Sequence, residues 1–200
     1  MAPVSLFDPV SIGSVTAKNR ICVPPMVLYG HAGDDGKVTA AHIRHYEELA
    51  QGGAGLIIQE ATCVTKGGRL SEDQLGIWSD DQLPGLRTIP EAVHRYGCPI
   101  FVQIHHAGVV GVGPEHLCPD SYVFVGRDGP VTGEKMTAAQ IAEVRDAFIA
   151  AGRRAYLAGY DGVELHGCHS YLLCQFLNSR VNRREDRYGR GPLRLVTEIM

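Results

Sequence analysis

Four short, mostly apolar segments alternate with amphipathic segments along the 200 residues of this chain. We expect these apolar segments to form strands at residues 20–23, 55–60, 99–104 and 161–165. Nearly continuous apolar strands between amphipathic helices are typical of parallel strands that helices cover on their outer face. The sequence therefore predicts an α/β fold built from repeated βα units, about four of which are present.

The amphipathic segments that follow the strands carry N-cap signals for helices. The expected helices run from a cap at Thr39 to Gln51, from Ser79 or Asp80 to near Gly97, from the capping box Thr137-x-x-Gln140 onward, and from Gly191 to Met200. The loops after the strands are long, above all residues 109–136, and they gather at the carboxyl edge of the strands, which is the catalytic face of a βα-barrel. We expect one domain without a linker, and no Rossmann site, because no G-x-G-x-x-G follows the first strand.

The composition excludes several classes of function. The apolar share of 44% and the charged share of 20% are ordinary for a globular protein, and the net charge of −3 gives no sign of nucleic acid or an anionic membrane as partner. No apolar run approaches the roughly 20 residues of a membrane-spanning helix, and the N-terminus lacks the pattern of a secretory signal. The six cysteines contain no C-x-x-C pair, so neither a zinc ribbon nor a redox dithiol is indicated. Most of them lie in or beside apolar strands, which fits reduced, buried thiols in a cytoplasmic protein.

Protonatable side chains follow the last predicted strand at His166, His169 and Tyr171. Two imidazoles and a phenol placed together can hold an oxyanion and deliver a proton. The H-x-x-H spacing also suits a pair of metal ligands, but two ligands do not complete a site and no third is evident, so no metal is predicted. Core histidines that hydrogen-bond their neighbours are the other interpretation.

Two further motifs follow earlier strands. Pro24 and Pro25 rigidify the exit from the first strand, ahead of Met26 and Tyr29, and by themselves they indicate a turn with apolar packing. Gln103 lies on a buried strand, where its amide needs either neighbouring backbone groups or a bound ligand as hydrogen-bond partners.

Together these motifs resemble the flavin-dependent Old Yellow Enzyme family of NADH:flavin oxidoreductases and ene-reductases. The family segments P-M-x-x-Y, Q-[LI]-x-H-x-G and H-x-x-H-x-Y-L-x-x-x-F-L match residues 25–29, 103–108 and 166–177. A charged family segment matches within 182–189, where we expect the charges to brace a loop and not to take part in chemistry. The resemblance extends from about Leu6 to Gly189.

The resemblance implies a TIM-barrel type of α/β fold, with residues 1–200 as the N-terminal part of an FMN-binding domain that has eight βα units in all. Cofactor-binding residues are then expected at Pro25, Met26, Val27, Ala61 and Gln103. Catalytic residues are expected at His166, His169, Tyr171 and Tyr29. Val27 stands where family members often have Cys or Thr. NAD(P)H would reduce the flavin, which would pass hydride to a small molecule with an activated C=C bond.

Four strands leave two open edges, so we expect a fragment, a truncated product or a half that pairs with another, and a homo-oligomer is one such arrangement. The alternative function is a catalytically inactive half-barrel that serves as an assembly or interaction module. A flavin-free barrel, such as an aldolase or a metal hydrolase, is least favoured, because no strand ends in a suitable lysine or a carboxylate–histidine cluster.

Overall fold

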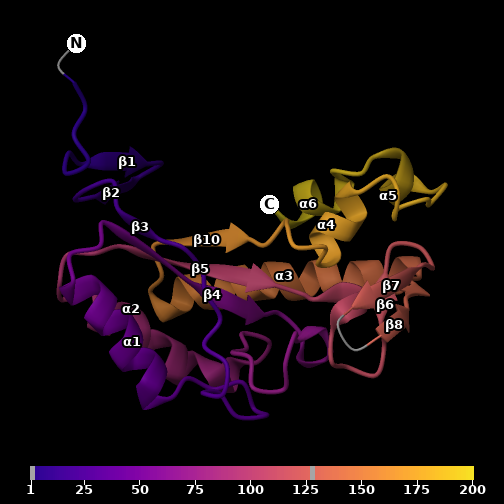
Figure 1. Ribbon diagram of the computed structural model, residues 1–200, viewed down its shortest axis with the longest axis horizontal. Helices are drawn as coiled ribbons and strands as arrows, with labels where there is room; N and C mark the ends of the chain where they lie inside the picture. Colours follow the sequence, from indigo (N-terminus) through magenta and orange to yellow (C-terminus); the bar gives the residue numbers. More distant parts are fainter. Residues whose placement is uncertain (1–2, 127–128) are drawn as a thin grey trace.

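A parallel sheet with the strand order β10–β5–β4–β3 forms the centre of the computed structural model, which describes residues 3–126 and 129–200 (Figure 1). Its strands are β3 (Cys22–Val23), β4 (Leu56–Cys63), β5 (Ile100–His105) and β10 (Gly162–Leu165). Every neighbouring pair is parallel, so the carboxyl ends of all these strands meet at one edge. The prediction of four βα units in a partial barrel is confirmed.

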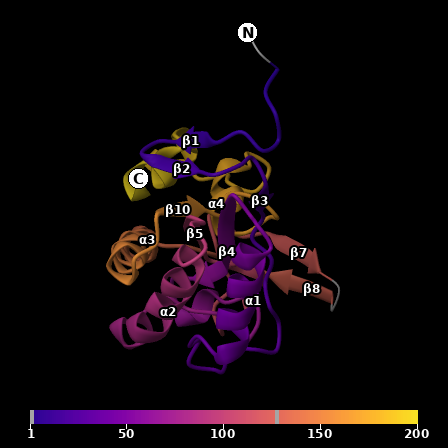
Figure 2. The same cartoon turned by 90° about the vertical axis from the view of Figure 1, so that its left-hand side faces the viewer.

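Three long helices cover one face of this sheet. They are α1 (Ala40–Gln51), α2 (Leu83–His94) and α3 (Ala138–Ala158). Figure 2 shows them on the same side of the sheet, with α2 packed between α1 and α3. The buried side chains of α3, such as Ile141, Val144 and Phe148, recur every three or four residues, which places them on one face of the helix. They form the core together with Ile57, Ile100 and other strand residues.

The predicted N-caps lie where the sequence indicated. Thr39, Ser79 and Thr137 each take part in a capping box. At α3 the Gln140 N–H donates to the hydroxyl oxygen of Thr137 at 3.2 Å, and the Thr137 N–H donates to the amide oxygen of Gln140 at 2.9 Å. Because these contacts are local, they were readable from the sequence.

Several short elements were not predicted. They are the strands β1 (Val10–Ile12), β2 (Val15–Ala17), β6 (Leu117–Cys118), β7 (Val123–Gly126), β8 (Gly129–Thr132) and β9 (Glu134–Lys135), the helices α4 (Leu172–Leu177), α5 (Arg187–Arg190) and α6 (Arg194–Ile199), and the 3-10 turns η1 (Lys66–Gly68), η2 (Asp80–Gln82) and η3 (Gly108–Val110). Of these, η2 lies at the start of the helix predicted from Ser79 or Asp80, and α6 lies in the helix predicted at residues 191–200. The β7–β8 hairpin and the β6–β9 pair lie within the predicted loop 109–136. The predicted first strand, 20–23, is shorter than expected, because only two of its residues pair with β4.

One extra residue in β4 changes which side chains reach the carboxyl edge. Gln59 pairs with Val102, but Thr62 pairs with Ile104, so the register shifts between them. Such a bulge re-aims the side chains on either side of it. As a result Glu60 contacts Tyr46 on α1, at a hydroxyl–carboxylate distance of 3.0 Å, while Ala61 lines the cavity described below.

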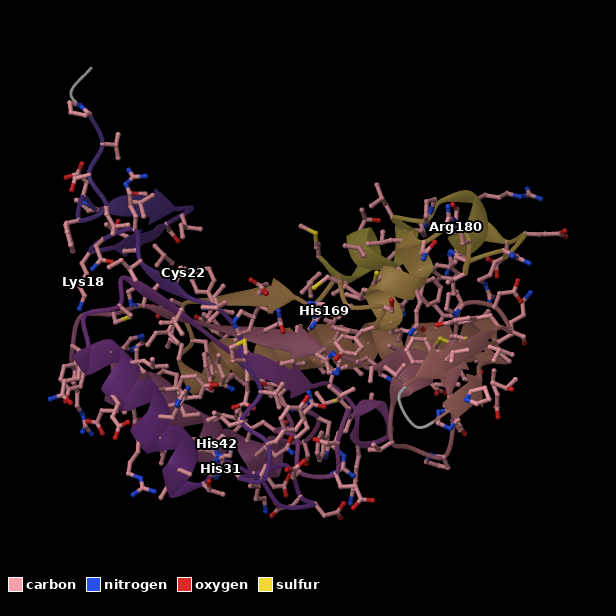
Figure 3. All side chains as sticks on the ribbon, in the orientation of Figure 1. Lys18, Cys22, His31, His42, His169 and Arg180 are labelled. Carbon is pink, nitrogen blue, oxygen red and sulfur yellow. The ribbon has the colours of Figure 1, made fainter. Side chains whose placement is uncertain are left out.

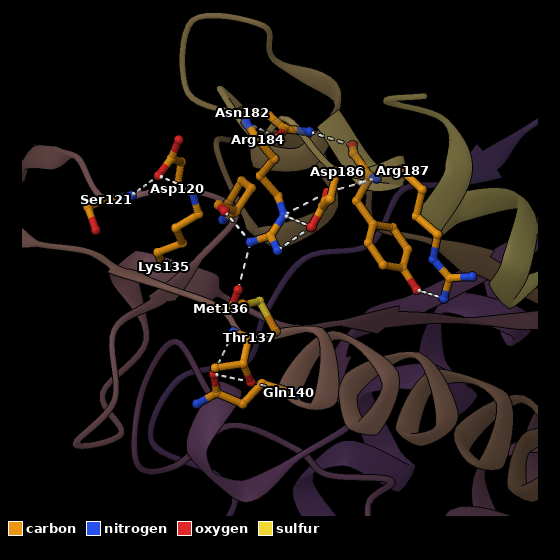
Figure 4. A network of polar contacts seen from close by, with 12 residues as sticks. Asp120, Ser121, Lys135, Met136, Thr137, Gln140, Asn182, Arg184, Asp186 and Arg187 are labelled. Carbon is orange, nitrogen blue, oxygen red and sulfur yellow. Dashed lines mark hydrogen bonds and ion pairs between the residues drawn. The ribbon is translucent and has the colours of Figure 1, made fainter. Parts of the chain in front are cut away.

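Arg184 ties the C-terminal segment to the long loop after β5. Its guanidinium group donates to the carbonyl oxygens of Pro119 and Met136 at 2.8 and 2.6 Å, and it pairs with Asp186 (Figure 4). Asn182 donates from its side-chain amide to the carbonyl oxygen of Tyr188 at 2.9 Å. The prediction that the charges of this segment brace a loop is confirmed.

The cysteines differ in exposure more than the sequence suggested. All six are free thiols; Cys63, Cys98 and Cys118 are buried, Cys174 is half-buried, and Cys22 and Cys168 are exposed. The expectation of burial is therefore wrong for Cys22, on the edge strand β3, and for Cys168, in the loop after β10. Within the described ranges, no helix has both the length and the apolar character needed to cross a membrane.

Candidate active site

A cavity of about 220 Å³ opens at the carboxyl edge of the sheet. It is lined by residues from the loops and strand ends of all four βα units: Pro25, Met26, Val27, Tyr29, Ala61, Leu70, Gln103, His105, His166, His169 and Tyr171. The structure thus brings together all nine of the residues that the sequence predicted as cofactor-binding or catalytic. Figure 3 shows His169 directly after the end of β10, at this edge.

The loop after β10 folds back on itself and gathers its aromatic side chains. His169 and Ser170 have φ values of 54° and 58°, in the left-handed region that residues other than glycine rarely adopt. The ring centroid of His166 lies 5.2 Å from that of His169 and 4.8 Å from that of Tyr171. The turn therefore places two imidazoles and a phenol around one point, as their spacing predicted.

The surroundings of these rings set their protonation. Desolvation, followed by the neighbouring His169, lowers the pKa of His166 to about 4, so this imidazole is neutral at pH 7. Its Nδ1 accepts a long hydrogen bond, 3.4 Å, from the backbone N–H of Cys168, which assigns the ring proton to Nε2. Desolvation, followed by Tyr29 and Cys168, raises the pKa of Tyr171, so its phenol keeps its proton. Both groups are therefore hydrogen-bond donors.

His105 belongs to the same cluster, although the sequence analysis assigned it no role. Its ring is fully buried, with its centroid 5.3 Å from that of His166 and 4.7 Å from that of Tyr171. Neither ring nitrogen has a hydrogen-bond partner among the described residues. The signal was available, because His105 follows Gln103 by two positions on β5 and so shares its face of the sheet.

The other residues that line this cavity are mostly apolar. Met26 is 67% exposed after the rigid Pro24–Pro25 exit, and Ala61 is almost fully buried beside the bulge. Gln103 is buried and donates from its side-chain amide to a carboxylate oxygen of Glu164 on β10, at 2.5 Å. An apolar platform with one buried amide at its margin suits the face of a flat, polar-edged ring.

A second cavity of about 470 Å³ adjoins the first at His169 and Tyr171. It extends to the β7–β8 hairpin, and its apolar lining includes Val110, Phe124 and Val131. His169 and Tyr171 therefore line both cavities.

Comparison with known proteins identifies the family. The sequence model of the NADH:flavin oxidoreductase / NADH oxidase family matches residues 5–195. The chain belongs to this family. Its members use FMN, with NAD(P)H as the reductant. The resemblance to Old Yellow Enzyme proposed from the motifs is thereby confirmed.

Relatives within this family cover almost the whole chain. An NADPH dehydrogenase of Geobacillus sp. (strain WCH70) is 44% identical over 188 residues, which are 94% of this chain and 55% of that protein. The structure of an old yellow enzyme homologue from Zymomonas mobilis matches with a TM-score of 0.88 at 33% identity, covering 98% of this chain and 58% of the other. Morphinone reductase in complex with tetrahydroNAD matches with a TM-score of 0.87 at 29% identity, covering 98% and 59%. The chain thus spans little more than half the length of these relatives.

Proposed function

We propose that this chain forms the substrate-binding and flavin-contacting part of an FMN-dependent NAD(P)H oxidoreductase that reduces activated C=C bonds. The observation that carries the proposal is the cavity at the carboxyl edge, which two imidazoles and a phenol line together with the apolar side chains of Met26 and Ala61. Membership of the family and the NADPH dehydrogenase relatives support the same reaction class.

The platform fits a flavin ring. Met26, on its rigid proline exit, and the small side chain of Ala61 would contact the ring face, with Pro25 and Val27 beside them. The buried amide of Gln103 would exchange part of its contact with Glu164 for the polar edge of the ring. When bound, FMN supplies hydride transfer between NAD(P)H and the acceptor.

His166 and His169 would hold the activating oxygen of the acceptor, such as the carbonyl oxygen of an enone. A neutral imidazole with its proton on Nε2 is a hydrogen-bond donor, and donation to this oxygen draws electron density from the conjugated C=C bond. Tyr171, whose phenol is protonated, would deliver a proton to the carbon next to the activating group. Tyr29 lines the same cavity and would shape it or share this role.

The adjoining chamber indicates what kind of acceptor fits. Its apolar lining between η3 and the β7–β8 hairpin suits the hydrocarbon body of a small molecule, whose polar group would lie against His169. For the reductant, the support is the tetrahydroNAD complex of morphinone reductase and the NADPH dehydrogenase relatives. Six free thiols support a place in the reducing cytoplasm.

One observation favours the alternative of an assembly module. β10 pairs only with β5 among the described strands, and Val163 on this edge strand is 39% exposed. An open edge of this kind is a template for further pairing, including with a second copy of the chain. Under this alternative the chain would associate without binding flavin.

Absorbance after incubation with FMN and desalting separates the two functions. A second protein, in which residues 1–200 are joined to the remaining part of the Geobacillus NADPH dehydrogenase, tests the site in a complete barrel. We expect this joined protein to retain FMN. When a small phenol is added as a ligand, the protein should also give a long-wavelength charge-transfer band. Replacing both His166 and His169 with Ala should remove that band, whereas replacing the exposed His31 should not. Failure of the joined protein to bind FMN would contradict the proposal. A charge-transfer band that survives the double substitution would contradict the roles of the histidines.

A further inference from the structure

Three metal-binding atoms converge in the loop after β10. The sulfur atom of Cys168 lies 3.6 Å from Nδ1 of His166 and 3.6 Å from Nδ1 of His169. The ligand atoms of all three residues lie within 4.8 Å of one another. The third ligand that the sequence analysis did not find is therefore Cys168, which lies between the two histidines in the chain.

The two sulfur–nitrogen distances match a tetrahedral zinc site. With a Zn–S distance of about 2.3 Å and Zn–N distances of about 2.0–2.1 Å, sulfur and nitrogen ligands of one tetrahedral ion lie about 3.6 Å apart. A thiol has a single proton, so it donates to one ring nitrogen at a time, whereas a cation engages all three lone pairs together. The two sulfur–nitrogen distances therefore fit a shared ion as well as a hydrogen bond.

The loop holds these atoms in place, and an ion would displace the long hydrogen bond from the Cys168 N–H to Nδ1 of His166. The N–H of Tyr171 donates to the carbonyl oxygen of Cys168 at 3.2 Å, and the amide of Gln175 donates to the carbonyl oxygen of Ser170 at 2.6 Å. These bonds stabilise the left-handed turn at His169 and Ser170. Within the described ranges, the Cys168 sulfur and the His169 Nδ1 have no side-chain or backbone partner outside this trio. Because Cys168 and His169 are exposed, an ion has access from solvent.

We propose that His166, Cys168 and His169 form a site for a borderline-soft divalent cation, with Zn²⁺ as the best fit and water in the fourth position. Imidazole and thiolate ligands select such ions over Mg²⁺ and Ca²⁺, which require oxygen. Binding forms a metal–sulfur bond and releases the thiol proton to solvent. The site depends on neither flavin nor substrate.

Titration of the metal-free 200-residue chain with Co²⁺ tests the site directly. A thiolate ligand in a tetrahedral Co²⁺ site gives a sulfur-to-metal charge-transfer band in the near ultraviolet, together with intense d–d bands in the visible. We expect both at one ion per chain, and we expect Zn²⁺ to displace the Co²⁺ and remove them. Cys168→Ala should abolish the charge-transfer band, and His169→Ala should weaken Co²⁺ binding by at least about tenfold.

Cys174→Ala is the matched control, because this thiol lies on the neighbouring helix α4 and is outside the proposed ligand set. Its spectrum should equal that of the unmodified chain. Cys168→Ala and Cys174→Ala each remove only a thiol group, and circular dichroism will show that each variant is folded. A charge-transfer band that persists in Cys168→Ala, or that disappears in Cys174→Ala, would overturn the assignment. So would the absence of a charge-transfer band in the unmodified chain.

Discussion

The carboxyl group of Glu60 accepts a hydrogen bond from the backbone N–H of Leu28 at 2.8 Å, although the two residues lie 32 positions apart. The hydroxyl group of Tyr46 donates to the other carboxyl oxygen at 3.0 Å and accepts from the Glu60 N–H at 2.9 Å. Glu60 is fully buried. A buried acid on β4 thus holds the loop that presents Met26 and Tyr29 to the cavity.

This acid should make stability depend on pH. Desolvation raises the pKa of Glu60 to about 7, against the hydrogen bonds from Leu28 and Tyr46 that lower it. Because the folded state binds this proton more tightly than the unfolded state, the contribution of Glu60 is full below the unfolded pKa and is lost as the pH rises through 7. The unfolding free energy of the parent protein, taken relative to that of the Glu60→Gln variant, should fall by roughly 3 kcal/mol between about pH 4.5 and about pH 7.5.

Urea denaturation of both proteins across this pH range measures the effect. The nearby His42, whose pKa is lowered to about 4 mainly by desolvation, is present in both proteins, so its opposite contribution largely cancels in the difference. If the difference in unfolding free energy between the two proteins stays constant with pH, the raised pKa of Glu60 is contradicted.

His105 should weaken the fold in acid. Desolvation, followed by His166 and His106, lowers the pKa of His105 well below its ordinary value. Its contribution to stability is therefore present above the unfolded pKa and is lost as the pH falls below it. His105→Leu removes this loss together with two unpartnered ring nitrogens, so the variant should match the parent at neutral pH and exceed it in acid. Thermal melts at about pH 7 and about pH 5 compare the two proteins, and parallel losses of stability would show that His105 does not titrate as proposed.

Two adjacent glycines in η1 should respond differently to alanine. A Cβ atom on Gly68 would lie 2.4 Å from the ring of the buried His106, whereas a Cβ atom on Gly67 would meet no atom within 4 Å. We expect Gly68→Ala to lower the unfolding free energy by about 1–3 kcal/mol, and Gly67→Ala to change it by less than about 0.5 kcal/mol. Equal effects in chemical denaturation would mean that His106 moves aside freely.

Arg184 should contribute more to stability than its neighbour Arg183. Replacing Arg184 with Met keeps the apolar stem but leaves the carbonyl oxygens of Pro119 and Met136 without their charged donor. The expected loss in unfolding free energy is roughly 2–4 kcal/mol. Arg183 is exposed, so Arg183→Ala should stay within about 0.5 kcal/mol of the parent. Similar stabilities for the two variants in denaturant would show that the Arg184 contacts contribute little.

Much of the fold and of the candidate site was readable from local pattern. The capping box of Thr137 and Gln140 and the apolar face of α3 depend on residues three or four positions apart. The nine predicted site residues line one cavity because each lies near or beyond the carboxyl end of a parallel strand, and such ends share one edge of the sheet. The hairpin of β7 and β8 was missed because its short strands depend on tertiary packing for their stability.

The sequence by itself determined the alternation of strands and helices, the helix caps and the family motifs, because these depend on spacing along the chain. Only the tertiary structure decided that Cys168 approaches both histidines, since that requires two consecutive left-handed residues at His169 and Ser170. It also decided that Glu60 holds Leu28, because a bulge in β4 and a contact across 32 residues are needed. Backbone torsions and long-range contacts of this kind leave no periodic trace in a single sequence.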